Sequence, residues 1–301
     1  MTRKSEDWKQ DLKQLPQEMI IVLIILMIVG ICWVFLRAKT NTTTKSNNIV
    51  DQKTYTQTRK NDAPFGLYTS PKIPKKDVYS IVMVGDSMTE ALGPHGGKLN
   101  EFINTLYQST PGHQRIVIDN YAKGSTNILG LEEAMMKKTV SGDSVFPPLL
   151  SRPFDLILIE SFGYNPLSQL GIDGGLKKQT QVLDSLMKLL TRTHPNSAIF
   201  FVATIAPNGE TYGQNEAPGE TLGERQMQAK ERMDYIKNHI AYAKSHNIPL
   251  IDIYDKSLTP SGDGDLSYIN PNDHIHPSFQ GIDFISQEIA NFIYANQTLQ
   301  K

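Results

Sequence analysis

The chain has 301 residues, with 30 lysines and arginines against 31 aspartates and glutamates, and a single cysteine. The balanced charge gives no sign of a nucleic-acid-binding surface or of an acidic disordered tail. The lone cysteine, Cys32, excludes a disulfide framework and a paired-cysteine metal site, and it leaves no thiol nucleophile in the globular part of the chain.

The first element that the sequence predicts is a membrane anchor. Residues 1–18 mix acidic and basic side chains, and Met19–Leu36 then run for 18 residues without a charge, which is long enough for a helix to cross the hydrocarbon core. A cleaved signal peptide and a buried core helix are the alternatives. The mixed flank and the lack of an Ala-x-Ala site favour an uncleaved anchor over residues 19–37. Lysines and arginines are nearly balanced on its two sides, so charge leaves its orientation open.

A polar linker is predicted to follow the anchor. Residues 38–76 are rich in Thr, Asn, Lys, Gln and Pro and lack apolar periodicity. Such a segment buries too little apolar surface to offset its ordering entropy, so we expect it to be flexible. Residues 77–301 are then predicted to form one domain of ordinary size.

Within that domain, predicted strands alternate with predicted helices. Runs rich in β-branched and aromatic residues predict strands, and apolar residues at helical spacing predict helices between the strands and one more that closes the domain. Several strands are apolar throughout, as in a sheet covered on both faces. The alternation predicts a doubly wound α/β/α sandwich with its ligand crevice beyond the carboxyl ends of parallel strands. The strands are Val78–Val84, Arg115–Ala122, Phe154–Ser161, Ala198–Ile205 and Pro249–Tyr254, and the helices cover residues 98–108, 176–192, 223–246 and 278–295.

Polar residues at three strand ends suit acyl transfer, although each has a structural alternative. Ser87 of Gly85-Asp86-Ser87 is a candidate nucleophile, while Asp86 or Ser87 can equally cap the next helix. A second Gly-Asp-Ser at residues 142–144, expected in a loop with no strand before it, shows that three letters alone decide nothing. Gly124 either brings a backbone N–H close to a ligand or only allows a positive φ. Asn165 either donates its amide to an oxyanion or caps a turn.

The segment before the last helix, Asn270–Gly281, carries the strongest signal. Asp273 and His276 lie three residues apart in a loop, so the carboxylate can accept the imidazole Nδ1–H and leave Nε2 to receive the proton of Ser87. A metal site at Asp273, His274 and His276 is the alternative, but no matching ligand motif occurs elsewhere, and we expect no metal and no cofactor. The remaining histidines are assigned to surface or turn positions: His95, His113, His194, His239 and His246.

Together these motifs resemble those of the SGNH, or GDSL-type, hydrolases over about Ser80–Ala295. The resemblance implies a three-layer α/β/α sandwich with a flavodoxin-like five-stranded parallel sheet. It implies Ser87 as nucleophile, His276 as base and Asp273 as the partner of the imidazole. It also implies an oxyanion hole made by the backbone N–H groups of Ser87 and Gly124 and the amide of Asn165, with Gly85, Asp86 and Gly163 as supporting motif residues. One departure is Pro166, which stands where the family commonly has Asp and offers no side-chain donor or acceptor.

The resemblance implies a serine esterase that works through an acyl-serine intermediate. An anchor and a linker would hold it near an envelope surface, so we expect O-acetyl or short-chain acyl esters, including esters on envelope glycans, and no nucleic acid. Two alternatives stay open: an O-acyltransferase that uses the same triad with a sugar hydroxyl, and an inactive module of this fold that binds a glycan or a protein. By resemblance to anchored family members, we expect the domain to lie outside the cytoplasm.

Overall fold

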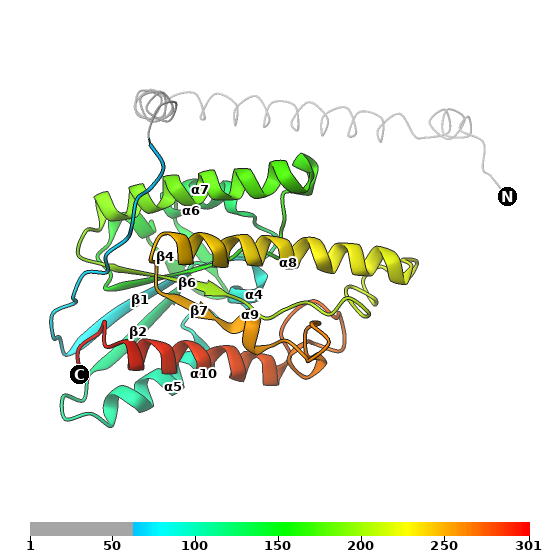
Figure 1. Cartoon of the computed structure of the whole chain (residues 1–301). Coiled ribbons are helices and arrows are strands. Elements are labelled where there is room, and N and C mark those ends of the chain that lie inside the picture. The colour runs from blue at the N-terminus through cyan, green and yellow to red at the C-terminus, as the bar shows by residue number, and fades with distance from the viewer. Residues whose placement is uncertain (1–62) are drawn as a thin grey trace, which may run out of the picture. The chain divides into compact units, whose positions relative to one another are not determined.

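The computed structural model describes residues 63–301 (Figure 1). The anchor predicted over residues 19–37 and the greater part of the predicted linker lie outside the described residues. Among the residues that are described, no helix combines the length and the apolar character that crossing a bilayer requires.

Within residues 63–301, a five-stranded parallel sheet forms the centre of the fold, in the order β2-β1-β5-β6-β7. The chain passes from β1 to β2 on one side and then to β5 on the other, so the strand order reverses at β1, where a ligand crevice is expected. The predicted parallel α/β fold is confirmed. The strands are β1 (Val78–Val84), β2 (Arg115–Asn120), β5 (Leu156–Glu160), β6 (Ala198–Ala203) and β7 (Leu250–Asp252).

Side chains of the central strands alternate between two apolar cores. On β1, Ile81 and Met83 belong to one core, while Val82 and Val84 belong to the other. Every residue of β5 and β6 is buried, as expected for strands that are covered on both faces.

Two layers of helices cover the two faces of the sheet. Helices α7 and α8 lie on one side of the sheet, and α5 and α10 lie on the other (Figure 1). The start of α8 is fixed by a capping box between Thr221 and Glu224. Ser278 caps the start of α10, and its hydroxyl accepts the Gly281 N–H. The α-helices are α4 (Ser87–Glu90), α5 (Gly97–Gln108), α6 (Leu131–Met135), α7 (Gly171–Thr193), α8 (Leu222–Ser245), α9 (Ile253–Lys256) and α10 (Phe279–Asn296). Short 3-10 turns are η3 (Ile128–Gly130), η4 (Leu149–Ser151), η5 (Ser168–Leu170) and η6 (Leu266–Tyr268).

The last strand is shorter than predicted. The run Pro249–Tyr254 was expected to be one strand, but β7 ends at Asp252 and α9 follows at once. The Asp252 side chain caps this helix by accepting the Asp255 N–H at 3.2 Å. A capping carboxylate thus ends the strand within an apolar run.

A small antiparallel hairpin, β3 (Thr139–Ser141) and β4 (Ser144–Phe146), was not expected from the sequence. Its turn contains Gly142, with a φ of 55°, a value that glycine adopts without strain. The second Gly-Asp-Ser therefore follows a strand, and its assignment to a loop with no strand before it was wrong. Strands of three residues are too short for an alternating pattern to identify.

Part of the predicted linker packs against the domain. Tyr68 is 4% exposed and Ile73 is fully buried. The Tyr68 hydroxyl accepts the N–H of Ile199 at 2.9 Å, and Ile73 pairs with Leu299 in a parallel bridge. The packed structure therefore begins before residue 77, because isolated apolar residues in a polar segment find sites on the domain.

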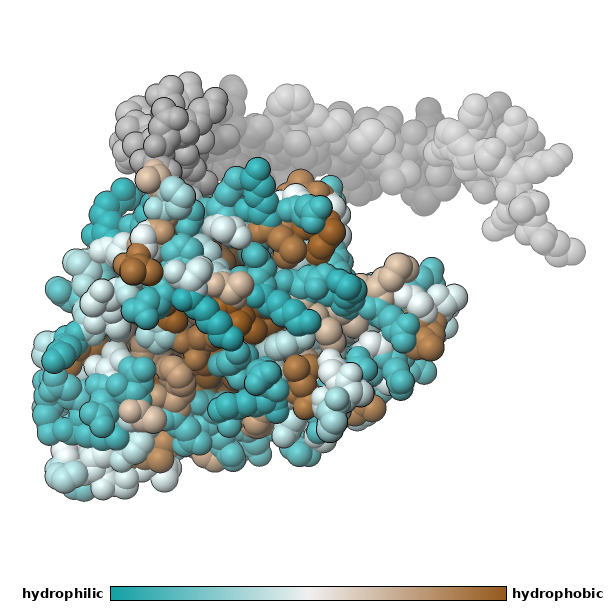
Figure 2. Space-filling model, in the orientation of Figure 1, coloured by the Kyte–Doolittle hydropathy of each residue, from teal (hydrophilic) through white to brown (hydrophobic). Residues whose placement is uncertain are grey.

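The visible face of the domain is mostly hydrophilic, with hydrophobic side chains in separate patches (Figure 2). This distribution fits a domain whose large apolar side chains are mainly buried in the two cores.

Candidate active site

The candidate nucleophile Ser87 follows β1 and starts α4. Glycine is required two residues earlier, because a Cβ on Gly85 would lie 2.8 Å from the Cβ of Glu160. The fully buried Asp86 caps α4 by accepting the Met88 N–H at 2.9 Å. The capping role belongs to Asp86, and Ser87 is left half-buried at the carboxyl edge of the sheet.

Asn165 is held by that capping residue. Its Nδ2 donates to Asp86 Oδ2 at 3.1 Å, and its backbone N–H donates to Phe162 O at 3.2 Å. A side-chain amide has two hydrogens, so one can hold the position while the other serves an oxyanion. Asp86 therefore supplies the support that Pro166 cannot give.

A buried carboxyl group joins the two loops. Glu160, the last residue of β5, is 2% exposed, and its Oε2 accepts the N–H groups of Asp86 at 3.3 Å and of Phe162 at 3.0 Å. Burial raises the pKa of Glu160 well above its ordinary value, and the nearby Asp86 carboxylate raises it further. Burial also raises the pKa of Asp86. Glu160 is the member of this pair that keeps its proton to higher pH.

Asp273 and His276 form the predicted hydrogen bond. His276 Nδ1 lies 3.1 Å from Asp273 Oδ2, and Asn270 Nδ2 donates to the same oxygen at 3.1 Å. The other carboxylate oxygen accepts the N–H groups of Ile275 at 2.7 Å and of His276 at 2.9 Å. Partial burial raises the pKa of Asp273, but these hydrogen bonds outweigh it and hold the pKa below its ordinary value. The carboxylate is thus ionised and fixes the imidazole.

The histidine is electrostatically linked to the nucleophile turn. A positive charge on His276 lowers the pKa of the Asp86 carboxyl, opposing the larger effect of burial. The His276 side chain is 41% exposed, whereas that of Asp273 is 18% exposed. With Nδ1 bound to the carboxylate, Nε2 is the nitrogen left for proton transfer.

Gly124 lies directly beside Ser87. The Lys123 N–H donates to Gly85 O at 3.1 Å, which runs the loop after β2 alongside the nucleophile turn. A Cβ on Gly124 would lie 3.5 Å from the Cβ of Ser87 and 2.7 Å from Glu90 Oε2. Glycine at position 124 therefore allows the loop to lie close to Ser87 and Glu90.

Gly163 has a packing role. A Cβ at this position would lie 2.3 Å from Cγ1 of Ile236 on α8, so the helix can approach the loop only if residue 163 is glycine.

The structure brings Ser87, Gly124 and Asn165 together from the ends of β1, β2 and β5, and their catalytic roles stay predictions. Within residues 63–301, no group of three or more His, Cys, Asp or Glu side chains is arranged to hold a metal ion.

Comparison with known families decides the class of this protein. The sequence profile of the GDSL-like lipase/acylhydrolase family matches residues 81–289. The chain belongs to that family. The predicted family and the predicted reaction class, a serine ester hydrolase, are confirmed.

Solved structures that are similar to this chain include GDSL-type proteins and an acetyl xylan esterase. A protein from Parabacteroides merdae assigned as a GDSL-like lipase has a TM-score of 0.51 and 16% identity, over 76% of this chain and 100% of that one. The lipase/acylhydrolase from Enterococcus faecalis has a TM-score of 0.48 and 15% identity, over 72% of this chain and 96% of that one. The acetyl xylan esterase AlAXEase has a TM-score of 0.49 and 15% identity, over 70% and 98%. No curated protein matches the sequence.

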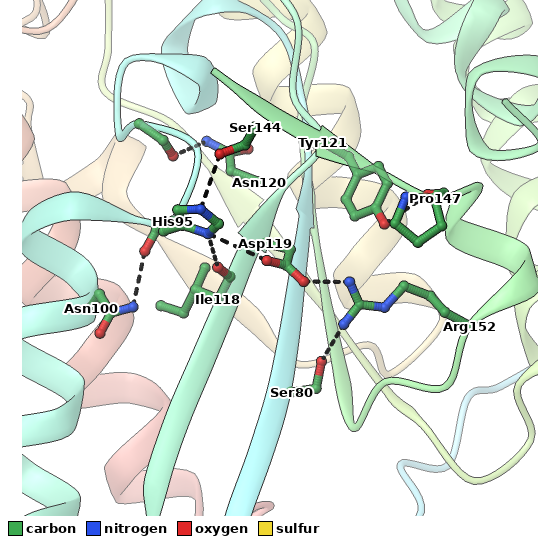
Figure 3. Close-up of polar contacts among 11 residues, drawn as sticks. Ser80, His95, Asn100, Ile118, Asp119, Asn120, Tyr121, Ser144, Pro147 and Arg152 are labelled. Atoms are coloured by element: carbon green, nitrogen blue, oxygen red, sulfur yellow. Dashed lines mark hydrogen bonds and ion pairs between the residues drawn. The ribbon is translucent and has the colours of Figure 1, made fainter. Parts of the chain in front are cut away.

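This GDSL-type hydrolase also has a serine, a histidine and an aspartate in contact at the hairpin (Figure 3). Ser144 Oγ lies 3.1 Å from His95 Nε2, and His95 Nδ1 lies 3.4 Å from Asp119 Oδ1. Arg152 binds the other Asp119 oxygen and donates to Ser80 Oγ at 3.1 Å. The Asp119 carboxylate is thus shared between the guanidinium and the imidazole. The cluster fastens the hairpin to β2.

His239 does not occupy the surface or turn position assigned to it. It is fully buried on α8 and stacks on Phe201 at 4.3 Å between ring centroids. Burial lowers the pKa of His239 to about 3, so the ring is neutral. Its place in an amphipathic helix was hidden because polar and apolar residues mix along α8.

Three residues of the site were not singled out from the sequence: Glu160, Asn270 and Glu90. Glu160 had a usable signal, since a lone acid ends an apolar strand and buried acids need partners. Asn270 and Glu90 act through contacts with Asp273 and Gly124. Only the folded chain shows those contacts.

Proposed function

We propose that this hydrolase cleaves O-acetyl or other short-chain acyl esters, including esters carried by envelope glycans. The observation that carries the proposal is the 3.1 Å contact between Asp273 Oδ2 and His276 Nδ1. It supports His276 as an oriented base, and the loops that carry Gly124 and Asn165 lie against the turn that carries Ser87.

In the first step, His276 Nε2 takes the proton of Ser87 as Oγ attacks the ester carbonyl. The Asp273 carboxylate stabilises the imidazolium that forms. The N–H groups of Ser87 and Gly124 and the free amide hydrogen of Asn165 stabilise the oxyanion. The imidazolium then protonates the departing alcohol, which leaves an acyl group on Ser87.

In the second step, His276 removes a proton from water as the water attacks the acyl-serine, and the acid is released. The exposed His276 side chain, at 41%, supports this step because solvent reaches the base. That exposure favours hydrolysis over transfer to a sugar hydroxyl, which requires water to be excluded.

The core beneath α4 is tightly packed. Its void lined in part by Met88, Thr89 and Leu92 has a volume of about 10 Å³, roughly the space of one water molecule. An acyl chain therefore cannot extend into this part of the core.

Hydrolysis of p-nitrophenyl acetate by the full chain tests the proposal, with Ser87→Ala and a chelator as controls. We expect turnover by the parent, turnover by the parent with chelator, and none by Ser87→Ala. Acetylated glycans are then compared with and without an acceptor sugar, and acetate release without acceptor is expected. Equal activity of Ser87→Ala and the parent refutes the mechanism.

We also propose that residues 19–37 anchor the protein in a membrane with the hydrolase domain outside the cytoplasm. The charge-free run of Met19–Leu36 supports the anchor. Protease added to intact cells should digest the domain. Protection of the domain until the cells are lysed contradicts this orientation.

A further inference from the structure

The oxyanion donor next to Ser87 is already bound. The backbone N–H of Gly124 donates to Glu90 Oε2 at 2.7 Å, a length typical of a charge-assisted hydrogen bond. Glu90 is the last residue of α4, three residues after Ser87. Residues three apart on a helix share a face, so the nucleophile and this carboxylate face the same loop.

The carboxylate lies where an oxyanion would form. A Cβ on Gly124 would be 2.7 Å from Glu90 Oε2 and 3.5 Å from the Cβ of Ser87, so the three groups share one small volume. A substrate oxygen that receives the Gly124 N–H becomes negatively charged in the transition state. Two negative oxygens at one N–H repel each other, so Glu90 and the reacting ester compete for it.

We propose that Glu90 caps the oxyanion hole of the free enzyme and selects against anionic acyl groups. This inference rests on the proposed function, because it assigns the Gly124 N–H to the oxyanion. Glu90 is exposed, so its side chain can rotate away without unfolding the core. After displacement the carboxylate stays at the mouth of the site, where it repels a negatively charged acyl chain and tolerates an acetyl group.

Two variants of Glu90 separate the effect of its hydrogen bond to Gly124 from the effect of its negative charge. Glu90→Ala removes both, whereas Glu90→Asp keeps the charge on a side chain one methylene shorter that reaches Gly124 less well. We expect Glu90→Ala to raise kcat/KM for p-nitrophenyl acetate about tenfold, equivalent to about 1.4 kcal/mol. For the p-nitrophenyl ester of succinic acid the gain should be several-fold larger. Glu90→Asp should raise kcat/KM for the acetyl ester, and the increase for the succinyl ester should be no larger.

A matched control is Glu101→Ala, which removes another exposed glutamate, on the neighbouring helix α5, paired with Lys98. It should leave both esters unchanged. Thermal melting by circular dichroism checks that every variant is folded. If folded Glu90→Ala is equal to the parent or slower on both esters, or gains equally on both, the cap with charge selection is refuted.

Labelling of the full chain by a fluorophosphonate distinguishes this failure from failure of the proposed function. Ser87 Oγ forms a bond to phosphorus, fluoride leaves and His276 takes the proton, so labelling needs the nucleophile, its base and the oxyanion hole but no hydrolysis of an acyl-serine. We expect faster labelling of Glu90→Ala than of the parent by intact mass. A parent that is labelled and hydrolyses esters, with Glu90→Ala labelled no faster, overturns the cap alone. A parent that is neither labelled nor active overturns both proposals.

Discussion

Replacement of Glu160 tests the buried carboxyl group that links the nucleophile turn to the Asn165 loop. Glu160→Ala removes the acceptor of two buried N–H groups, those of Asp86 and Phe162. Each buried donor left unpaired costs about 1–3 kcal/mol, so we expect a loss of about 2–6 kcal/mol in the free energy of unfolding. That is a large part of the stability of an ordinary domain.

Glu160→Gln is the matched control, since its amide oxygen can accept both N–H groups and it resembles a protonated carboxyl group in shape. We expect it to lie within about 1 kcal/mol of the parent, the usual scale of one hydrogen bond. Chemical denaturation followed by far-UV circular dichroism measures both variants. If Glu160→Gln is as unstable as Glu160→Ala, the assignment of a protonated Glu160 side chain between the two loops is refuted.

The pH dependence gives an independent check. Burial raises the folded-state pKa of Glu160 above its ordinary value of 4.5. The protonated side chain therefore stabilises the fold fully below pH 4.5, and this contribution declines as the pH rises toward the raised pKa. Each pH unit in that window removes about 1.4 kcal/mol in the parent. Glu160→Gln does not titrate, so its stability should fall less steeply, and parallel profiles would contradict the assignment.

Three further substitutions probe the site and its support. Asp273→Asn should lower kcat by roughly 10³–10⁴-fold, because the imidazole loses its anionic partner; ester hydrolysis at constant pH measures it, and a loss under tenfold contradicts the role. Asn165→Ala should lower kcat by roughly 10²–10³-fold with a smaller change in KM, and a loss confined to KM would indicate a binding role. Gly163→Ala should destabilise the fold by about 1–3 kcal/mol, because its Cβ would lie 2.3 Å from Cγ1 of Ile236. The control Gly223→Ala, on α8 with nothing within 4 Å, should be neutral or slightly stabilising in the same denaturation assay.

Much of the fold was predictable because the apolar composition of each central strand reflects its burial. A strand buried on both faces, such as β5, has to be mostly apolar, and the long segments with helical spacing between the strands and after the last strand mark the covering layers. The predictions failed where a local polar contact overrode the pattern, as at Asp252, or where an element was too short for periodicity, as in β3 and β4.

The chemistry of the candidate site can be predicted from the amino-acid sequence alone. Asp273 and His276 are close in the chain, so their hydrogen bond is nearly local, and Ser87 lies at the end of an apolar strand. Family membership follows from the same motifs.

The contacts that support the site, and the carboxylate that binds the Gly124 N–H, are visible only in the folded chain. Asn165 is held by Asp86, 79 residues away in the chain, and the Gly124 N–H is bound by Glu90, 34 residues away. These contacts depend on which strands are neighbours, and strand order is set by packing of the whole sheet. No pattern within one segment encodes them.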